Sequence, residues 1–286
     1  MVGVPGRQDP EGSGRLTDIF AAQGTDPAVL AELYDLEHDE RDDDLVFYGE
    51  FARRARGDIL DLGTGSGRLL PALVRAARRR VVGVDGSAAL LERARRRVEA
   101  EPDLRTASAA GKLELVLGDV RDVPATGPFS LVVVVGVLPH LPGAADAERM
   151  LRSAARRLTR AGRLIVDVPG PAALPDRDLP LATDWVRRRA GETVRRKSRL
   201  THRRRDGEVS VLLSTITEVE KADGTIARLP AAFQLWYPDL RVLEQLYARA
   251  GLGVSSVYGS HELDTFGDES ERLIVVGERP PRHRSV

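Results

Sequence analysis

Residues 59–68 read Ile-Leu-Asp-Leu-Gly-Thr-Gly-Ser-Gly-Arg, and a second apolar stretch, Val81-Val82-Gly83-Val84-Asp85, follows them. The first stretch predicts a strand that runs into three alternating glycines and then a helix. The second predicts a strand that ends in a carboxylate eighteen residues after the last glycine. Glycines let main chain approach a ligand closely and adopt positive φ, and an acid at the tip of the second strand can bind both hydroxyls of a ribose. The two stretches together predict a binding site for a ribose-containing ligand.

The spacing of the glycines argues against two common nucleotide sites. A dinucleotide fold requires Gly-x-Gly-x-x-Gly, which would place the third glycine at position 68, where the chain has Arg68. A P-loop requires Gly-Lys-Ser or Gly-Lys-Thr, and the sequence contains neither. Asp61, two residues before the first glycine, would repel a pyrophosphate and attract an ammonium group. The pattern therefore favours a ligand that carries an amino group.

Composition indicates a soluble globular enzyme. The 286 residues are 42% hydrophobic and 30% charged, and 43 basic residues balance 43 acidic ones, so no net charge favours nucleic acid or membrane. The absence of cysteine excludes disulfides, thiolate metal sites and cysteine nucleophiles. We find neither a signal peptide nor an apolar run that could span a bilayer, and we expect a cytoplasmic protein without a metal site.

Helix and strand patterns alternate through the first part of the chain. Asp26-Pro27 resembles a helix start, and a second helix is expected over 43–55. The apolar run 131–135 is typical of a parallel strand that is buried on both faces. Alternating units of this kind predict a doubly wound sheet. The expected order is strand 58–63, helix 66–79, strand 80–85, helix 87–100, strands 112–118 and 129–136, helix 146–159 and strand 162–168.

The pattern changes after Pro169. Asp206-Gly207 and Asp223-Gly224 lie between strand-like stretches and predict a three-stranded antiparallel insertion. A helix over 239–250 and strands over 253–258 and 272–278 would complete a seven-stranded, mostly parallel α/β sheet, with the last strand antiparallel. The expected organisation is a disordered tail over 1–25, a helical segment over 26–56, a Rossmann-like domain over 57–170 and 238–279, the insertion over 171–237 and a flexible tail over 280–286.

Asp-x-Gly-x-Gly-x-Gly, with Asp85 at the end of the next strand, resembles the first motif of class I S-adenosylmethionine-dependent methyltransferases. Gly118-Asp119-Val120 resembles the motif of this family whose carboxylate accepts a hydrogen bond from the adenine amino group. The resemblance is firm over about residues 30–170 and implies S-adenosylmethionine as cofactor. The implied cofactor-binding residues are Asp61, Gly63, Thr64, Gly65, Gly67, Asp85, Gly86, Asp119, Val120, Gly136 and Val137.

The resemblance also implies residues for the chemistry. Tyr34 and His140 correspond to a lid tyrosine and a histidine after the fourth strand that face the substrate amine in bacterial amino-sugar N-methyltransferases. Either residue could instead be structural, the tyrosine as a half-buried helix aromatic and the histidine as a cap. The segment 26–56 would form a lid, and the insertion resembles the small β domain that lies over the active site of those enzymes. Further candidates are Trp185, Trp236 and Tyr237 for an acceptor pocket, His261, Glu262, Asp264 and Asp167 near the active end of the sheet, and Tyr48 as core or lid.

The most favoured function is N-methylation of a small-molecule amine, an amino sugar or another natural-product intermediate. A metal-independent O-methyltransferase that uses His140 as base stays open. A nucleic-acid methyltransferase is disfavoured because Val-Leu-Pro-His follows the fourth strand in place of Asn/Asp-Pro-Pro-Tyr/Phe, and because cytosine C5 methylation needs a cysteine. An inactive scaffold is disfavoured because the glycines and acids are intact. A homodimer through the insertion is plausible.

Overall fold

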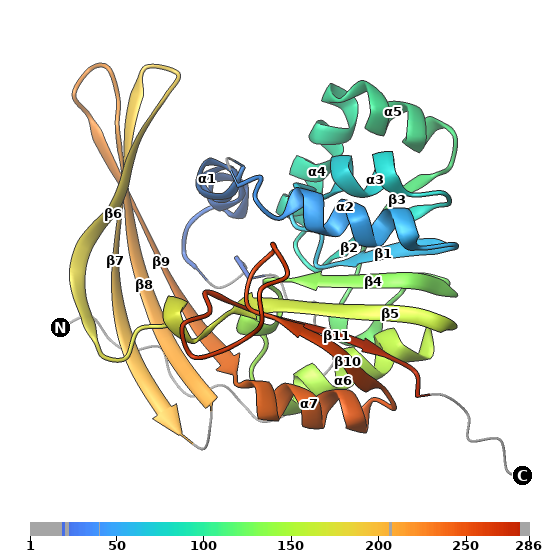
Figure 1. Cartoon of the computed structure of the whole chain (residues 1–286). Coiled ribbons are helices and arrows are strands. Elements are labelled where there is room, and N and C mark those ends of the chain that lie inside the picture. The colour runs from blue at the N-terminus through green and yellow to red at the C-terminus, as the bar shows by residue number, and fades with distance from the viewer. Residues whose placement is uncertain (1–18, 21–22, 40, 206–207, 281–286) are drawn as a thin grey trace, which may run out of the picture.

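The computed structural model describes residues 19–20, 23–39, 41–205 and 208–280 (Figure 1). The two expected tails, 1–25 and 280–286, lie largely outside the described residues, as does the expected Asp206-Gly207 turn. Residues 19–20 and 23–25 depart from the expected disorder because they pack against the rest of the chain. Phe20 is buried, and the Gln23 side chain exchanges two hydrogen bonds of 2.7 Å with the main chain of Ala232.

A seven-stranded sheet forms the centre of the larger part of the molecule, which confirms the expected α/β class. Its order is β10-β11-β5-β4-β1-β2-β3, and β11 runs antiparallel to both of its neighbours while the other pairs are parallel. The sheet is doubly wound, because the chain moves outward from β1 first through β2 and β3 and then through β4 and β5 on the other side. The strands are β1 Asp58–Leu62, β2 Val81–Asp85, β3 Leu113–Leu117, β4 Phe129–Val135, β5 Leu158–Pro169, β10 Gly253–Tyr258 and β11 Arg272–Glu278.

Helices cover both faces of this sheet, with α6 and α7 on one face and α2, α3 and α5 on the other (Figure 1). The helix after the glycines begins at Leu70, four residues later than expected, because Gly65 and Gly67 adopt positive φ and cannot be part of a helix. No helix among the described residues combines the length and apolar character needed to cross a bilayer. The elements are α2 Leu45–Arg54, α3 Leu70–Ala76, α4 Ala88–Ala100, α5 Pro102–Ala109, α6 Ala144–Arg156, α7 Leu240–Arg249 and the short 3₁₀ turns η1 Val120–Asp122, η2 Leu138–His140 and η3 Pro171–Ala173.

The insertion forms a separate antiparallel sheet of four strands in the order β6-β7-β8-β9, so the expectation of three strands was wrong. The additional turn lies at Ala190 and Gly191, which both have positive φ. This pair lacks the Asp-Gly signature, and the sequence pattern therefore gave no turn there. The strands are β6 Leu179–Arg189, β7 Glu192–Arg205, β8 Glu208–Glu220 and β9 Ile226–Pro238.

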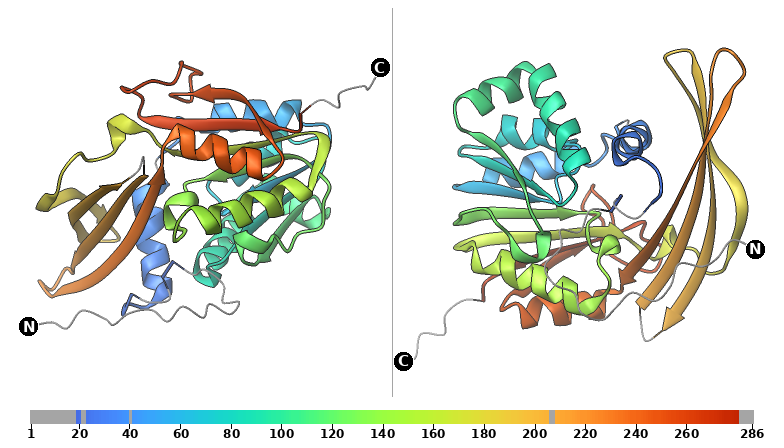
Figure 2. Two further views of the ribbon diagram at one scale, coloured as in Figure 1. Left: turned by 90° about the horizontal axis from the view of Figure 1, so that it is seen from below. Right: turned by 180° about the vertical axis from the view of Figure 1, so that it is seen from behind.

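Helix α1, Pro27–His38, lies between the two sheets (Figure 2). It begins where the sequence predicts, because the Asp26 carboxylate accepts a hydrogen bond from the Ala28 N–H at 2.8 Å and Pro27 occupies the first helical position. One side of α1 packs on α4, and the other faces β8 and β9. The helix therefore forms a wall between the seven-stranded sheet and the insertion.

Candidate active site

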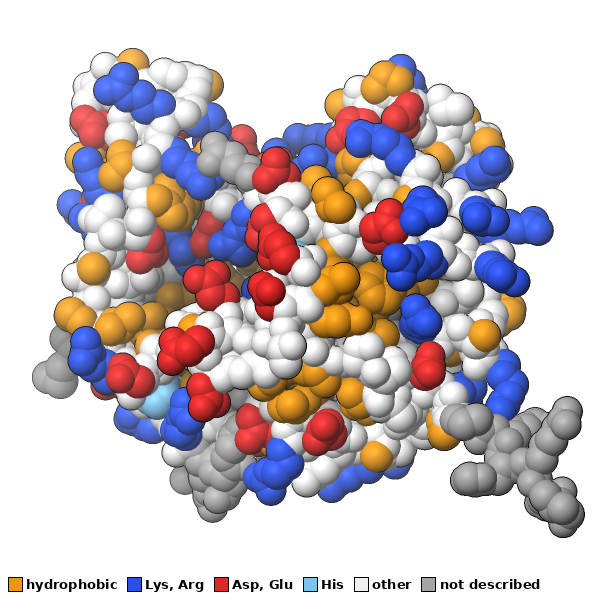
Figure 3. Space-filling model, in the orientation of Figure 1, with side chains coloured by type: hydrophobic (Ala, Val, Ile, Leu, Met, Phe, Trp, Pro, Cys, Tyr) orange, Lys and Arg blue, Asp and Glu red, His pale blue; other side chains and the backbone are white. Residues whose placement is uncertain are grey.

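The topology brings the sequence-predicted residues to one edge of the seven-stranded sheet. The direction of winding reverses between β1 and β4, and ligands of doubly wound sheets bind at the carboxyl ends of the strands beside such a reversal. Gly63 follows β1, Asp85 ends β2 and Gly136 follows β4. Figure 3 shows a notch in the surface between the insertion and the helices of the larger part, with acidic side chains gathered over the loop between β10 and β11.

Three adjoining pockets occupy this region, and Tyr34 and His140 line all three. We call them the glycine pocket, the central pocket and the sheet pocket. The glycine pocket is lined by Gly63, Gly65, Asp85, Gly86, Val120 and Val137. The central pocket is lined by His38, Arg41, Asp61, Thr64, Gly136 and Arg272, among others. The sheet pocket lies between α1 and the strands β8 and β9.

The glycine loop brings bare main chain to the glycine pocket. Gly63 and Gly65 have φ of 85° and 57°, a region that L-residues with side chains rarely adopt. A Cβ atom at Gly63 would lie 2.1 Å from Cγ2 of Val137, so the first glycine is also required for a close approach between the loop and η2. Gly65 donates its N–H to the Asp85 carboxylate at 2.8 Å. The loop and the predicted ribose-binding acid are therefore held in one arrangement.

Two acids line the pockets from β1 and β2. The Asp85 carboxylate accepts the N–H groups of Gly65 and Ser87, each at 2.8 Å, and it lines the glycine pocket. Asp61 is 2% exposed and accepts the Thr64 hydroxyl at 2.7 Å. Burial, with the nearby Asp85 charge, raises the pKa of Asp61 to about 6. A cationic group bound beside Asp61 would favour its ionised form.

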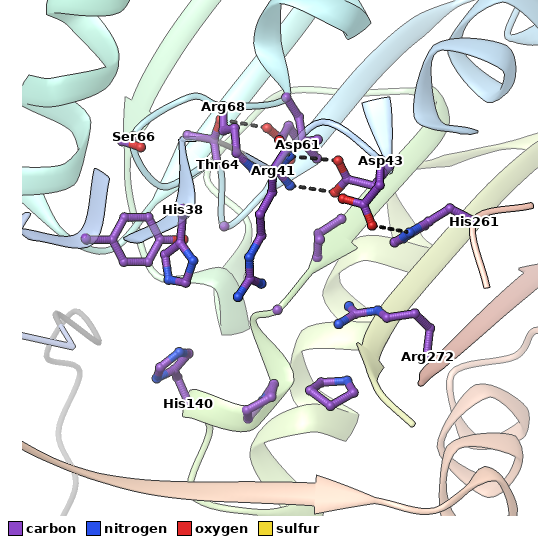
Figure 4. A pocket seen from close by; sticks show the side chains of 18 of the residues that line it. His38, Arg41, Asp43, Asp61, Thr64, Ser66, Arg68, His140, His261 and Arg272 are labelled. Atoms are coloured by element: carbon purple, nitrogen blue, oxygen red, sulfur yellow. Dashed lines mark hydrogen bonds and ion pairs between the residues drawn. The ribbon is translucent and has the colours of Figure 1, made fainter. Parts of the chain in front are cut away.

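Figure 4 shows His38 from α1 and His140 from η2 on opposite sides of the central pocket, with Arg41 extending into the space between them. Burial lowers the pKa of His140 to about 4, and burial with the Arg41 charge lowers that of His38 to about 3, so both imidazoles are neutral at pH 7. Burial also raises the pKa of Tyr34 to about 12, so its hydroxyl remains a donor. The junction of the pockets thus holds three uncharged, hydrogen-bonding side chains.

Several predicted site residues lie outside the lining of these pockets. The Asp119 carboxylate binds the guanidinium of Arg121, which also reaches Asp146 at 2.9 Å. A Cβ atom at Gly67 would approach Leu70 and Ala94, so this glycine serves packing against α4. Trp236 is buried in the core that the seven-stranded sheet forms with α6 and α7, and Glu262 and Asp264 are exposed. Trp185 lines the sheet pocket, and Tyr237 and His261 line the central one.

Asp167, at the end of β5, is the centre of a buried cluster that connects four elements or loops. Its carboxylate accepts the Tyr48 hydroxyl at 2.5 Å, lies 2.9 Å from Nε2 of His261 and binds the Arg272 guanidinium. These partners hold the pKa of Asp167 below its usual range although burial alone would raise it. Because Tyr48 belongs to α2, the cluster ties α2 to β5, β11 and the loop after β10. Tyr48 and Asp167 therefore have a structural role here.

Sequence reasoning missed His38 and Arg41 of the central pocket and Glu37 of the sheet pocket. His38 lies one helical turn after Tyr34, and the two ring centroids are 4.2 Å apart. The spacing i, i+4 on the predicted helix was a signal that could have identified His38. Arg41 lies in the loop between α1 and α2, where no periodic pattern indicates the direction of a side chain.

Comparisons with known proteins agree with this arrangement. Residues 59–162 match a family model described as a methyltransferase domain. An uncharacterized 37.1 kDa protein in transposon TN4556 of Streptomyces fradiae is 35% identical over 113 residues, which are 38% of this chain and 29% of that protein, so the chain spans under a third of this relative.

Solved structures resemble the whole fold at low sequence identity. The sugar N-methyltransferase KedS8 from Streptoalloteichus is 21% identical, with a TM-score of 0.65 over 98% of this chain and 100% of that one. The amino pentose methyltransferase CalS10 from Micromonospora echinaspora, solved with bound S-adenosylmethionine, is 21% identical, with a TM-score of 0.65 over 88% and 97% of the two chains. Residues 59–162 therefore match a methyltransferase domain, and the sheet order and the solved structures show that the chain has the fold of class I methyltransferases.

Proposed function

We propose that the protein transfers the methyl group of S-adenosylmethionine to an amine of a small molecule, an amino sugar or another natural-product intermediate. The observation that carries the proposal is that Tyr34 and His140 line the glycine pocket, the central pocket and the sheet pocket at once. A cofactor in the first two pockets and an acceptor in the third would meet between these two side chains. The names of the structurally similar enzymes, a sugar N-methyltransferase and an amino pentose methyltransferase, support the same substrate class.

The residues present fit the cofactor. Positive-φ glycines, with no room for a side chain at Gly63, form a cradle of main chain, and Asp85 lines the same pocket, where its carboxylate would bind the ribose hydroxyls. Asp61 would bind the ammonium group, and Arg41, which extends into the central pocket, would bind the carboxylate of the methionine part (Figure 4). Val120 would pack on the adenine, whereas Asp119 is already bound to Arg121.

The bound cofactor supplies an electrophilic methyl group on a sulfonium that leaves as a neutral thioether. The protein's task is alignment, which can contribute about 7–11 kcal/mol to lowering a barrier. The neutral His140 accepts a hydrogen bond from the amine N–H, and the Tyr34 hydroxyl, which stays protonated, donates one to an atom of the methyl acceptor other than the reacting nitrogen, whose lone pair attacks the methyl group. Desolvation in the pocket favours the uncharged amine, which is the nucleophilic form.

The pKa of His140 favours an amine over a hydroxyl as the methyl acceptor. O-methylation without a metal needs a base strong enough to take a hydroxyl proton as the bond forms. Burial lowers the pKa of His140 to about 4, which makes it a weak base. An amine needs no base in the bond-forming step once it is uncharged. We therefore favour N-methylation over metal-independent O-methylation as the proposed function.

Mass spectrometry of products from a panel of amino sugars and other amines, followed by Tyr34→Phe and His140→Ala, tests the proposal. We expect kcat/KM to fall by about 10²-fold in each variant, the loss that a misplacement of the reacting groups by about 1 Å can cause, while the affinity for S-adenosylmethionine changes less than about threefold. Tyr258→Phe and His202→Ala, outside the three pockets, are matched controls. Methylated hydroxyl products, or unchanged turnover in both variants, would contradict the proposal.

A further inference from the structure

The sheet pocket is a built cavity between a helix face and a sheet face. Helix α1 contributes a continuous face at helical spacing, and β8 and β9 contribute alternate residues, so each element directs one regular face into the same space. These faces leave about 200 Å³ between them, whereas a cavity of about 150 Å³ can hold a benzene ring. The residues on these two faces are Leu30, Leu33, Tyr34, Glu37 and His38 from α1 and Leu213, Thr215, Thr217, Ala231, Phe233 and Leu235 from β8 and β9.

One end of the sheet pocket is apolar. Phe20 is 4% exposed and packs with Leu30 and Ala231, and Phe233 packs against the same cluster. Phe233 also lies edge-on to His140, with ring centroids 6.4 Å apart, so the apolar end reaches the junction where Tyr34 and His140 stand. A ring placed against these side chains would remove apolar surface from water without meeting a charge.

The other end is polar, and its charges are already compensated. Glu37 Oε1 lies 2.6 Å from the Arg196 guanidinium, which Asp184 also approaches at 3.4 Å. Thr217 is the direct cross-strand neighbour of Arg196, is 6% exposed, and turns its side chain into the pocket. Arg196 is the one arginine or lysine among the described residues that line this pocket, and two carboxylates surround it. This end suits hydroxyl and N–H groups, which carboxylates accept, and it disfavours phosphate.

We propose that the sheet pocket binds the body of the methyl acceptor, and that this body is an uncharged ring compound with one apolar face and with hydroxyl groups. The apolar face lies against Phe20, Leu30 and Phe233, and the hydroxyl groups bind Glu37 and Thr217. An acceptor attached to a nucleoside diphosphate does not fit this end of the pocket. The inference rests on the proposed function, because it assigns the site of the acceptor in that same reaction.

Isothermal titration of the full-length protein, saturated with S-adenosylhomocysteine, tests the proposal with three glycosides of the same amino sugar. The probes are 4-nitrophenyl 2-amino-2-deoxy-β-glucopyranoside, the corresponding methyl glycoside and UDP-glucosamine. We expect the aryl glycoside to bind at least tenfold more tightly than either of the others. Tighter or equal binding of UDP-glucosamine, or no binding of the aryl glycoside, overturns the proposal.

Substitutions in the sheet pocket test whether the aryl glycoside binds there. Thr217→Val and Glu37→Gln keep the shape of each side chain, and we expect each to weaken the aryl glycoside at least fivefold. Thr183→Val, on the exposed strand β6, should bind it as the wild type does. Equal affinity in Thr217→Val, Thr183→Val and wild type contradicts the proposal, and thermal unfolding verifies that each variant is folded. Failure of the wild type to bind S-adenosylhomocysteine contradicts the proposed function, whereas normal cofactor binding without discrimination among the glycosides contradicts this inference alone.

Discussion

The glycine pocket and the sheet pocket share Tyr34 and His140 but differ in whether main chain or side chains form the rest of their surface. Four glycines and the Asp85 carboxylate line the glycine pocket together with apolar side chains, and Gly63 and Gly65 have positive φ. Side chains from helix α1 and from the strands of the insertion line most of the sheet pocket. A surface made of main chain requires glycine at fixed places, so it leaves a motif in the sequence. In a surface made of side chains, helices and strands fix the positions of the residues, and the ligand determines which residue types suit those positions.

We expect the largest change in unfolding free energy from disrupting the buried cluster around Asp167. Asp167→Ala would leave Arg272 and His261 without their buried partner, and breaking a buried ion pair in this way costs about 3–5 kcal/mol of unfolding free energy. Urea denaturation followed by circular dichroism measures the change. Asp264→Ala, which removes an exposed carboxylate bound to the Ser260 hydroxyl, is the control and should cost under about 1 kcal/mol. An equal loss of unfolding free energy in Asp167→Ala and Asp264→Ala would show that the buried cluster does not stabilise the protein.

Local patterns made most of the larger sheet predictable. Strands 253–258 and 272–278, the antiparallel direction of the last strand and the helix start at Asp26-Pro27 are confirmed, because each depends on neighbouring residues. Two local features were missed. Helix α5 begins at Pro102, directly after α4, and the Ala190-Gly191 turn carries no Asn or Asp. Positive φ at an alanine has no sequence signature, because only the surrounding strand pairing imposes it.

The next effect separates the two acids that the sequence assigned to the cofactor. Asp85→Ala removes the partner of Gly65 and the predicted ribose acceptor, and we expect affinity for S-adenosylmethionine to fall by about 1–3 kcal/mol. Asp119→Ala should lower the affinity less than about threefold, because its carboxylate is bound to Arg121 and lies outside the lining of the glycine pocket. Isothermal titration of both variants measures the difference. A loss in Asp119→Ala as large as that in Asp85→Ala would restore the adenine role of Asp119.

The rest of the site could not be deduced, because its partners lie far apart in the chain. The Asp167 cluster joins residues 48, 167, 261 and 272, and no spacing rule connects them. The pairing of Asp119 with Arg121 is local, yet nothing in Gly118-Asp119-Val120 indicates that the carboxylate turns toward that arginine. Glu37 and His38 were within reach, since they continue the helical face that begins at Leu30 and includes Tyr34.

The smallest effect concerns pH and distinguishes Asp61 from the two histidines that line the central pocket with it. Asp61, with a pKa raised to about 6, takes up a proton as the pH falls from 7 to 5, whereas His38 and His140, with pKa values of about 3 and 4, stay neutral. Because the ammonium group of the cofactor favours ionised Asp61, affinity for S-adenosylmethionine should fall on the order of tenfold over this range.

As the pH falls, the contribution of Asp61 to the stability of the fold increases, whereas its contribution to cofactor affinity decreases. The folded protein binds the Asp61 proton more tightly than the unfolded chain does, so burying this charge opposes folding at pH 7, and that cost is relieved as the pH falls through 6. Asp61→Asn removes this titration but keeps both histidines. Its cofactor affinity should be lower at pH 7 and should vary little down to pH 5. An equally steep pH dependence in Asp61→Asn would assign the titration to another group and remove Asp61 from the cofactor side.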